Sequence, residues 1–263
     1  MKIQIASDLH QEWIQSVFKD APALTPAPDA DVLVLAGDIH ARLGGLQSFA
    51  DWPVPVVYVA GNHEAYGEQL HGLIDALKDQ AKTYKIHFLE LTEARMDGVR
   101  FLGSTMWTDY ELDGAAHAPR AMSLAERSMR DHHVINAAPG LFDAKKARDR
   151  HLASRAWLEA HLSTPFEGKT VVVTHHGPHP GGVARQFRGD PLNAAFFSDL
   201  RPLMTNVDLW VHGHTHSPVD IQEGRCRVIA NPRGYPLNLR HAASPAELTF
   251  ENRAFQPHLV IEI

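Results

Sequence analysis

Three histidines stand within five positions of the chain, directly after an apolar run. The stretch LWVHGHTHSP covers residues 209–218 and contains His212, His214 and His216. Imidazole is an uncommon choice for a solvated loop, but it is the commonest metal ligand among protein side chains. In extended backbone, residues two apart point to the same side of the chain. We therefore predict that His214 and His216 bind metal, either one ion or two neighbouring ions.

Four further apolar runs end in the same way, each followed at once by side chains that bind metals. One ion would not use seven donors from five separate segments, but two ions about 3.5–4 Å apart that share a carboxylate would. Nitrogen and oxygen donors without thiolate favour manganese, iron or zinc over a structural cysteine-type zinc site. The seven predicted ligands are Asp8, His10, Asp38, Asn62, His175, His214 and His216.

A glycine directly precedes three of these ligands or ligand pairs. Gly37, Gly61 and Gly213 each stand between an apolar run and a candidate donor. Glycine permits a sharp turn off a strand and a close approach of the backbone to another group. We expect these positions to be turns that place the donors against one another.

The apolar runs themselves predict the elements that must position these donors. Short β-branched runs that alternate with amphipathic segments are typical of an α/β fold, in which ligands bind outside the carboxyl ends of the strands. The helical pattern appears at 68–82, 148–162 and 193–204. The predicted strands are 3–6, 31–36, 54–60, 86–89, 99–103, 169–174, 207–211, 226–230 and 258–263.

The length of 263 residues suits one domain, residues 1–263. The polar, mixed stretch at about 104–147 fits no strand or helix pattern, and we interpret it as an insertion that forms a substrate wall. The Pro-rich segment 21–30 and the segment 180–191 are predicted loops.

Composition excludes several classes of protein. The net charge of −6 argues against binding to duplex nucleic acid, which requires a basic surface. The single cysteine, Cys226, rules out a disulfide within the chain and favours a reducing compartment. No signal peptide and no apolar run of membrane-spanning length are present, so we expect a cytoplasmic protein that does not act at a membrane. The oligomeric state is not fixed by the sequence.

The motifs together resemble the calcineurin-like metallophosphoesterase superfamily, whose pattern is D-x-H, G-D, G-N-H-[DE], H and G-H-x-H. The resemblance extends from residue 1 to about residue 235 and is greatest to bacterial predicted phosphoesterases, which share the block NPRGY at 231–235. It implies a four-layer α/β/β/α sandwich of two mixed sheets. The matching blocks are SDLH (7–10), GDIH (37–40), GNHE (61–64), THH (174–176) and GHTH (213–216).

The resemblance also implies a role for each matching residue. His63 would act as general acid, and Glu64 would orient the imidazole of His63. The block THHGP leaves open whether His175 or His176 is the ligand, and we choose His175 because it is nearer the strand end. One metal ion would take Asp8, His10, Asp38 and His216, and the other would take Asn62, His175 and His214 with Asp38 as the bridge.

The implied function is a dinuclear phosphoesterase in which a metal-bridging hydroxide attacks a small phosphoester substrate. We favour a phosphodiesterase over a phosphomonoesterase. The protein phosphatase motif G-D-x-V-D-R-G is incomplete here, where the chain reads GDIHARLGG, so protein phosphatase activity is not expected. Arg42, His176 and Arg233 are candidates for binding substrate; a surface salt bridge is an equal alternative for Arg42, and a packing role for His176. The alternative function is a non-catalytic metal-binding scaffold, against which the complete ligand set argues.

Overall fold

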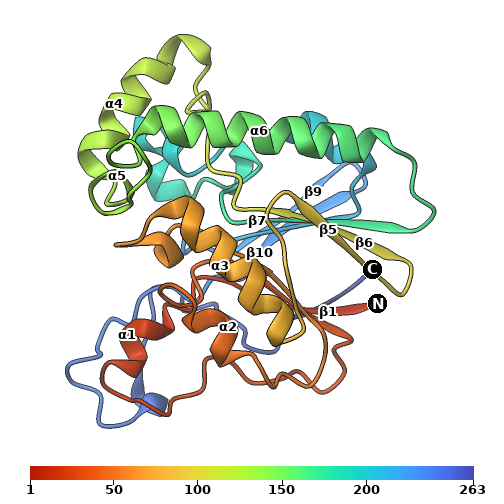
Figure 1. Ribbon diagram of the computed structural model, residues 1–263, viewed down its shortest axis with the longest axis vertical. Coiled ribbons are helices and arrows are strands. Elements are labelled where there is room, and N and C mark those ends of the chain that lie inside the picture. Colours follow the sequence, from red (N-terminus) through yellow and green to blue (C-terminus); the bar gives the residue numbers. More distant parts are fainter.

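The computed structural model describes residues 1–263 and contains two β-sheets (Figure 1). In the first sheet the strand order is β11 (Val260–Glu262), β1 (Lys2–Ala6), β2 (Val32–Ala36), β3 (Val56–Val59) and β4 (Ile86–Phe88). In the second it is β5 (Thr92–Met96), β6 (Val99–Ser104), β7 (Lys169–Thr174), β8 (Leu209–His212), β10 (Cys226–Ala230) and β9 (Val219–Glu223).

Both sheets are mixed: most strands are parallel, and antiparallel strands lie at three of the four sheet edges. Strands β1 to β4 are parallel to one another, as are β6, β7, β8 and β10. The antiparallel strands β11, β5 and β9 lie at the edges. The central strands are almost wholly buried. A strand that is covered on both faces has no face exposed to solvent, so its residues do not alternate between apolar and polar. This explains the continuous Val, Ile and Leu runs.

The helices cover the outer faces of the two sheets. One apolar cluster lies between the sheets and includes Ile5, Val34, Val59, Val173 and Val211. A second packs the first sheet against the helical segments of its outer face, and a third packs the second sheet against the longest helix. The layers are therefore α/β/β/α, as predicted. The helices are α1 (Gln11–Gln15), α2 (Gly44–Ser48), α3 (Leu70–Thr83), α4 (Ala118–Ser128), α5 (Asp131–Val134) and α6 (Ala144–Ser163).

Two strands were not predicted from the sequence, and one predicted helix is wrong. The missed strands, β5 and β9, are edge strands with several exposed side chains, so they lack the apolar runs of the central strands. The segment 193–204 is not an α-helix. It lies in the 3₁₀ turns η5 (Pro191–Ala195) and η6 (Arg201–Asn206), each of which begins with a proline at its first or second position. An intervening bridge from Phe197 to Gly177 separates the two turns.

The segment 104–147 carries α4 and α5 and packs against the body of the protein. Three small side chains, Ala118, Ala121 and Ala125, form the buried stripe of α4, which contacts η5 and α6. Alanine gives a weak apolar signal, which explains why the sequence pattern indicated no helix here. The interpretation of this segment as an insertion in a single domain stays a prediction.

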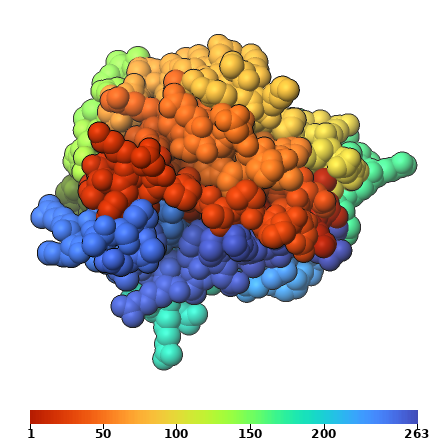
Figure 2. Space-filling model, turned by 90° about the horizontal axis from the view of Figure 1, so that it is seen from below, coloured from red at the N-terminus to blue at the C-terminus, as the bar shows by residue number.

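The two ends of the chain lie side by side. Strand β1 pairs with β11, and Figure 2 shows the C-terminal segment against the N-terminal one on the same face of the molecule. None of the helices combines the length and apolar character that crossing a membrane requires.

Candidate metal centre

The seven predicted ligands come together where β1, β2, β3, β7 and β8 end at their carboxyl ends. Loop backbones join these strand ends: the Asp8 amide donates to the Gly37 carbonyl at 2.9 Å, and the Gly213 amide donates to the His175 carbonyl at 3.0 Å. The donors thus come from both sheets and meet across the top of the sandwich. Two groups of these donors could each hold a metal ion, and a further group, His10, Asp38 and His63, shares one member with each of them.

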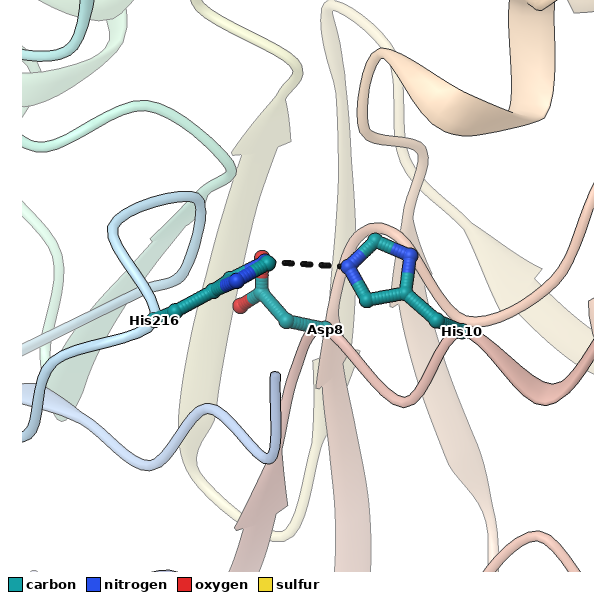
Figure 3. Close-up of side chains that lie close together, drawn as sticks. All are labelled: Asp8, His10 and His216. Carbon is teal, nitrogen blue, oxygen red and sulfur yellow. Dashed lines mark hydrogen bonds and ion pairs between the residues drawn. The ribbon is translucent and has the colours of Figure 1, made fainter. Parts of the chain in front are cut away.

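The first group consists of Asp8, His10 and His216 (Figure 3). The Nε2 atoms of His10 and His216 face each other at 3.0 Å, and His216 Nε2 lies 3.5 Å from Asp8 Oδ1. His216 is oriented by Glu251, whose Oε2 is 2.5 Å from Nδ1 on the other side of the ring. A carboxylate behind a histidine in this way fixes the ring and its tautomer in metal sites.

The second group consists of Asp38, His175 and His214, with Asn62 beside them. His175 Nε2 lies 3.0 Å from Asn62 Oδ1, 3.2 Å from His214 Nδ1 and 3.4 Å from Asp38 Oδ1. The other ring nitrogen of His175, Nδ1, contacts the Ala36 carbonyl at 2.9 Å. All four donors therefore converge on one point.

Asp38 lies between the two groups. Its Oδ1 faces His175, whereas its Oδ2 lies 3.9 Å from His10 Nε2 and 3.9 Å from His63 Nε2. Oδ1 also accepts a hydrogen bond of 2.9 Å from the His63 amide, which fixes the carboxylate. One oxygen toward each group is the arrangement that a bridging ligand requires.

Five of the seven ligands have left-handed backbone. Side chains other than glycine adopt positive φ infrequently, and such residues concentrate at functional sites because the surrounding structure must hold them there. The backbone thus bends sharply at the ends of β1, β2 and β8 to turn these donors inward. The residues and their φ values are Asp8 at 51°, His10 at 43°, Asp38 at 55°, His214 at 72° and His216 at 49°.

The glycines before the ligands give the donors room, as predicted. A Cβ at Gly61 would collide with the Asp38 carboxylate and with the ring of His175. Gly37 has a φ of 85°, and a Cβ there would collide with the same ring. These two positions allow the Asp38 and His175 side chains to pack against backbone.

The charges at the centre fit divalent cations. Asp8 and Asp38 are buried, and their ion pairs involve histidine but no lysine or arginine. Burial alone would raise the pKa of each carboxyl, but the surrounding imidazoles, chiefly His216 for Asp8 and His175 for Asp38, lower both. Buried carboxylates need a positive partner. Two carboxylates, an amide oxygen and four imidazoles with their nitrogens facing one another are a donor set suited to such ions.

His63 lies beside the centre and faces the cleft above it. Its Nε2 contacts the Tyr235 hydroxyl at 2.6 Å, and its Nδ1 is 3.6 Å from Glu12 Oε1. Burial would lower the pKa of His63, but Asp38 and Glu12 outweigh it and raise the pKa above its ordinary value. These carboxylates thus favour the protonated form of the imidazole, which is the form that a general acid needs.

Glu64 does not orient His63, contrary to the expectation. Its carboxylate accepts hydrogen bonds from the Tyr58 hydroxyl at 2.6 Å and from the amides of Ile39 at 2.9 Å and Gly61 at 2.8 Å. Glu64 therefore ties the loop after β2 to the loop after β3, because its side chain points back under the site. The carboxylate nearest to the His63 ring on its Nδ1 side is Glu12.

The structure moves two of the three predicted substrate contacts away from the site. The guanidinium of Arg233 is buried and donates to the carbonyls of Ala23 and Leu9 and to Gln11, so it joins loops rather than meeting substrate. Arg42 is exposed and pairs with Glu68 at 2.6 Å, the surface salt bridge that was its alternative.

His176, the third predicted substrate contact, is buried and does not line the cleft, so the prediction is wrong here too. Its ring packs against His214 with 4.2 Å between centroids, and its Nδ1 contacts the Thr105 carbonyl at 3.2 Å. Burial and the neighbouring His175 lower the pKa of His176 to about 3, so it stays neutral. It supports the ring of a predicted ligand from behind, which agrees with the packing alternative.

Asp131, from the segment 104–147, fixes the orientation of the Asn62 amide. Its Oδ1 accepts hydrogen bonds from Asn62 Nδ2 at 2.9 Å and from the Tyr66 hydroxyl at 2.7 Å. With Nδ2 held there, Asn62 Oδ1 must face His175. The sequence placed Asp131 in the segment 104–147, interpreted as a substrate wall, and gave it no role at the metal centre.

Sequence reasoning gave no role to three residues that touch the ligands or His63. Glu12 lies two residues after the first motif, SDLH, and Tyr235 ends the NPRGY block, so both are close to a motif in the sequence. Tyr235 also stacks on His10, with 4.3 Å between ring centroids. Glu251 had no local signal, because it reaches His216 from a distant part of the chain.

A cleft of about 530 Å³ opens above the centre. Asp38, Asn62, His63, His214 and His216 form its floor. The loops of residues 184–197 and Met129 of the segment 104–147 contribute to its walls. A small ester could therefore reach the centre from solvent.

Comparison with known proteins found a family model that matches most of the chain and solved structures of similar fold. The family model described as calcineurin-like phosphoesterase matches residues 1–218. Among solved structures, the phosphopantetheinyl hydrolase PptH from Mycobacterium tuberculosis is similar in fold, with a TM-score of 0.70, 20% identity and 95% of each chain covered. The protein TT1561 of Thermus thermophilus has a TM-score of 0.48 and 14% identity over 88% of each chain. The curated proteins include no match to the chain.

Proposed function

The chain belongs to the calcineurin-like phosphoesterase family, and on that premise we propose that it hydrolyses a phosphodiester with two divalent metal ions bound at the candidate metal centre. The observation that carries the proposal is the pair of donor groups joined by Asp38. Manganese, iron and zinc suit these donors, and the ion present in a cell depends also on supply.

Each ion would be held by its own group of side chains and by one oxygen of Asp38. One set is Asp8, His10 and His216, and the other is Asn62, His175 and His214. When bound, the ions supply the positive charge that stabilises a phosphoryl group in the transition state, and they make water available as a nucleophile near neutral pH. The protein fixes the geometry of the donors, because contacts with neighbouring groups hold the carboxylates of Asp8 and Asp38 and the imidazole rings in place.

His63 is placed to assist the departure of the leaving group. Its Nε2 is at the cleft floor, where it contacts the Tyr235 hydroxyl at 2.6 Å. In the proposed reaction the oxygen of the leaving group lies beside Nε2, where the Tyr235 hydroxyl is in this structure, and it receives the proton from Nε2. Asp38 and Glu12 raise the pKa of the ring and so favour its protonated form. General acid catalysis of this kind contributes about 10²–10⁴-fold to a rate.

The charge of the cleft favours a diester over a monoester. No lysine or arginine lines the cleft, so nothing beyond the metal centre and its histidines would balance the second negative charge of a monoester. The name of the M. tuberculosis neighbour adds phosphopantetheinyl esters to the substrates to be tested.

The test is metal-dependent hydrolysis of bis-p-nitrophenyl phosphate and p-nitrophenyl phosphate by protein whose metals have been quantified. We expect turnover of the diester with manganese, at a higher kcat/KM than the monoester, and loss of turnover in a folded Asp38→Asn variant. Turnover of neither ester with manganese, iron, cobalt, nickel or zinc would contradict the proposal and favour the metal-binding scaffold. A preference for the monoester would contradict only the diester assignment.

A further inference from the structure

One wall of the cleft is apolar from the metal centre outward. The ring of Phe196 packs on the imidazole of His214, with 4.7 Å between centroids, so the wall begins at a predicted ligand. Leu192 and Phe187 continue it, and Met129 lines the cleft from the segment 104–147. We call Met129, Phe187, Leu192 and Phe196 the apolar wall.

The outermost member of the apolar wall is open to solvent. Phe187 ends the short 3₁₀ turn η4 (Arg185–Phe187), and half of its side chain, 50%, is exposed. An exposed aromatic side chain at the rim of a cleft loses contact with water when a ligand covers it, which stabilises the complex roughly in proportion to the apolar area buried. The wall is therefore suited to bind an apolar group.

The remaining charges of the cleft disfavour an ionised group along this wall. Besides Asp38, the acidic residues that line it are Asp190 and Glu251, and no lysine or arginine offsets them. Asp190 stands between Phe187 and Leu192 in the chain, and its Oδ1 accepts a hydrogen bond of 2.9 Å from the Leu192 amide. A substrate arm that carries a carboxylate or a second phosphate would be repelled there.

We propose that the substrate is a phosphodiester with one uncharged, mainly aliphatic arm, and that this arm lies along the apolar wall while the phosphoryl group lies over the metal centre. The inference rests on the proposed function and narrows its substrate class. It follows from two independent features of one cleft: the apolar side chains that continue from His214, and the acidic Asp190 beside them in a cleft that no lysine or arginine lines.

The experiment measures kcat/KM for p-nitrophenyl phosphodiesters that share the leaving group and differ in the other arm. The arms are methyl, butyl, hexyl, 5-carboxypentyl and 5′-thymidyl. We expect kcat/KM to rise at least tenfold from methyl to hexyl, because one fully buried methylene contributes up to about fourfold. The 5-carboxypentyl ester should fall at least tenfold below the hexyl ester of equal length.

Variants locate the effect at the apolar wall. Phe187→Ala and, as a second and independent change, Leu192→Ala should each lower the ratio of hexyl to methyl kcat/KM at least threefold. Asp190→Asn, which retains an oxygen for the Leu192 amide, should raise kcat/KM for the 5-carboxypentyl ester relative to hexyl. The matched control is Leu152→Ala on α6, whose side chain is also half-exposed at 45% but does not line the cleft, and it should leave every ratio unchanged.

The outcomes separate this inference from the proposed function. Equal kcat/KM for all arms, or a preference for the 5-carboxypentyl or the thymidyl ester, overturns the inference and leaves phosphodiester hydrolysis standing. If no ester is hydrolysed, the proposed function fails. The wall is then tested by calorimetry with hexyl methylphosphonate against methyl methylphosphonate: tighter binding of the hexyl compound that Phe187→Ala removes supports it, and equal binding overturns it.

Discussion

At the scale of single residues, the protein combines fixed donors with a histidine that can move a proton. The Asp38 and Glu12 carboxylates lie on either side of the His63 ring, whereas Glu64, which the sequence indicated for this role, does not contact the ring. This difference has a physical reason. Glu64 follows His63 directly in a 3₁₀ turn, η1 (His63–Ala65), and its side chain turns back to satisfy buried amides.

The role of His63 predicts a dependence on the leaving group. In His63→Asn, kcat for a diester with an alkyl leaving group should fall by about 10²–10⁴-fold, because the departing alkoxide needs a proton. The fall for a p-nitrophenyl ester should be much smaller, since that oxygen leaves as a stable anion. The measurement is kcat for both esters with metal content verified; equal losses on both esters would show that His63 acts in another way.

The histidines of the metal centre predict that metal binding releases protons. Burial would lower the pKa of His175 and His216, but Asp38 for the first, and Asp8 and Glu251 for the second, raise them to about 9 and about 10 in the metal-free protein. Both rings are therefore protonated at pH 7, and the stability that this protonation gives the metal-free fold is lost as pH rises through 9 to 10. Metal ligands must be neutral imidazoles, so binding displaces protons.

We expect calorimetry at pH 7 in two buffers of different ionisation enthalpy to report release of up to two protons, and metal affinity to increase between about pH 6 and 9. Affinity that is independent of pH would contradict this assignment of ligands.

At the scale of elements, strand ends supply the ligands and the segment 104–147 supplies a support. The sequence was enough to predict the seven ligands because each follows a buried apolar run directly, and that relation is local. It could not locate the contact from Asp131 to Asn62, because α5 reaches the loop after β3 only through the tertiary packing of the chain. Glu251 and Tyr235 were missed for the same reason: they lie in irregular segments after the last ligand.

The Asp131 contact predicts a selective loss of one metal ion. Asp131→Leu removes the acceptor that holds the Asn62 amide, and the affinity of the second group for manganese should fall about 10–100-fold, the usual cost of losing a residue that supports a metal ligand. Competition titration with a chelating dye measures both sites. Asp113→Asn, an exposed change in the same segment, serves as control and should bind both ions as the unaltered protein does. Unchanged affinity in Asp131→Leu would contradict the supporting role.

At the scale of the whole molecule, the fold explains why donors spread from Asp8 to His216 meet. The sequence predicted the α/β class, the two mixed sheets and the family, and the structure and the comparisons confirm them. Nine strands were predicted from their apolar runs, whereas the two polar edge strands and the alanine-striped α4 were not, since each depends on neighbours for its burial.

Because the predicted ligands of each ion come from both sheets, we expect metal to stabilise the folded state as a whole. A ligand present at 100 times its Kd stabilises by about 2.7 kcal/mol if it does not bind the unfolded chain. We expect a chelator to lower the melting temperature and manganese to restore it, with a smaller shift in Asp38→Asn. A melting temperature that is indifferent to both additions would argue against ions that link the two sheets.

The central claim is tested most directly by anomalous diffraction from crystals of manganese-loaded protein. We expect two peaks about 3.5–4 Å apart, with Asp38 between them, one beside Asp8, His10 and His216 and the other beside Asn62, His175 and His214. A single peak, or peaks away from these side chains, would contradict it.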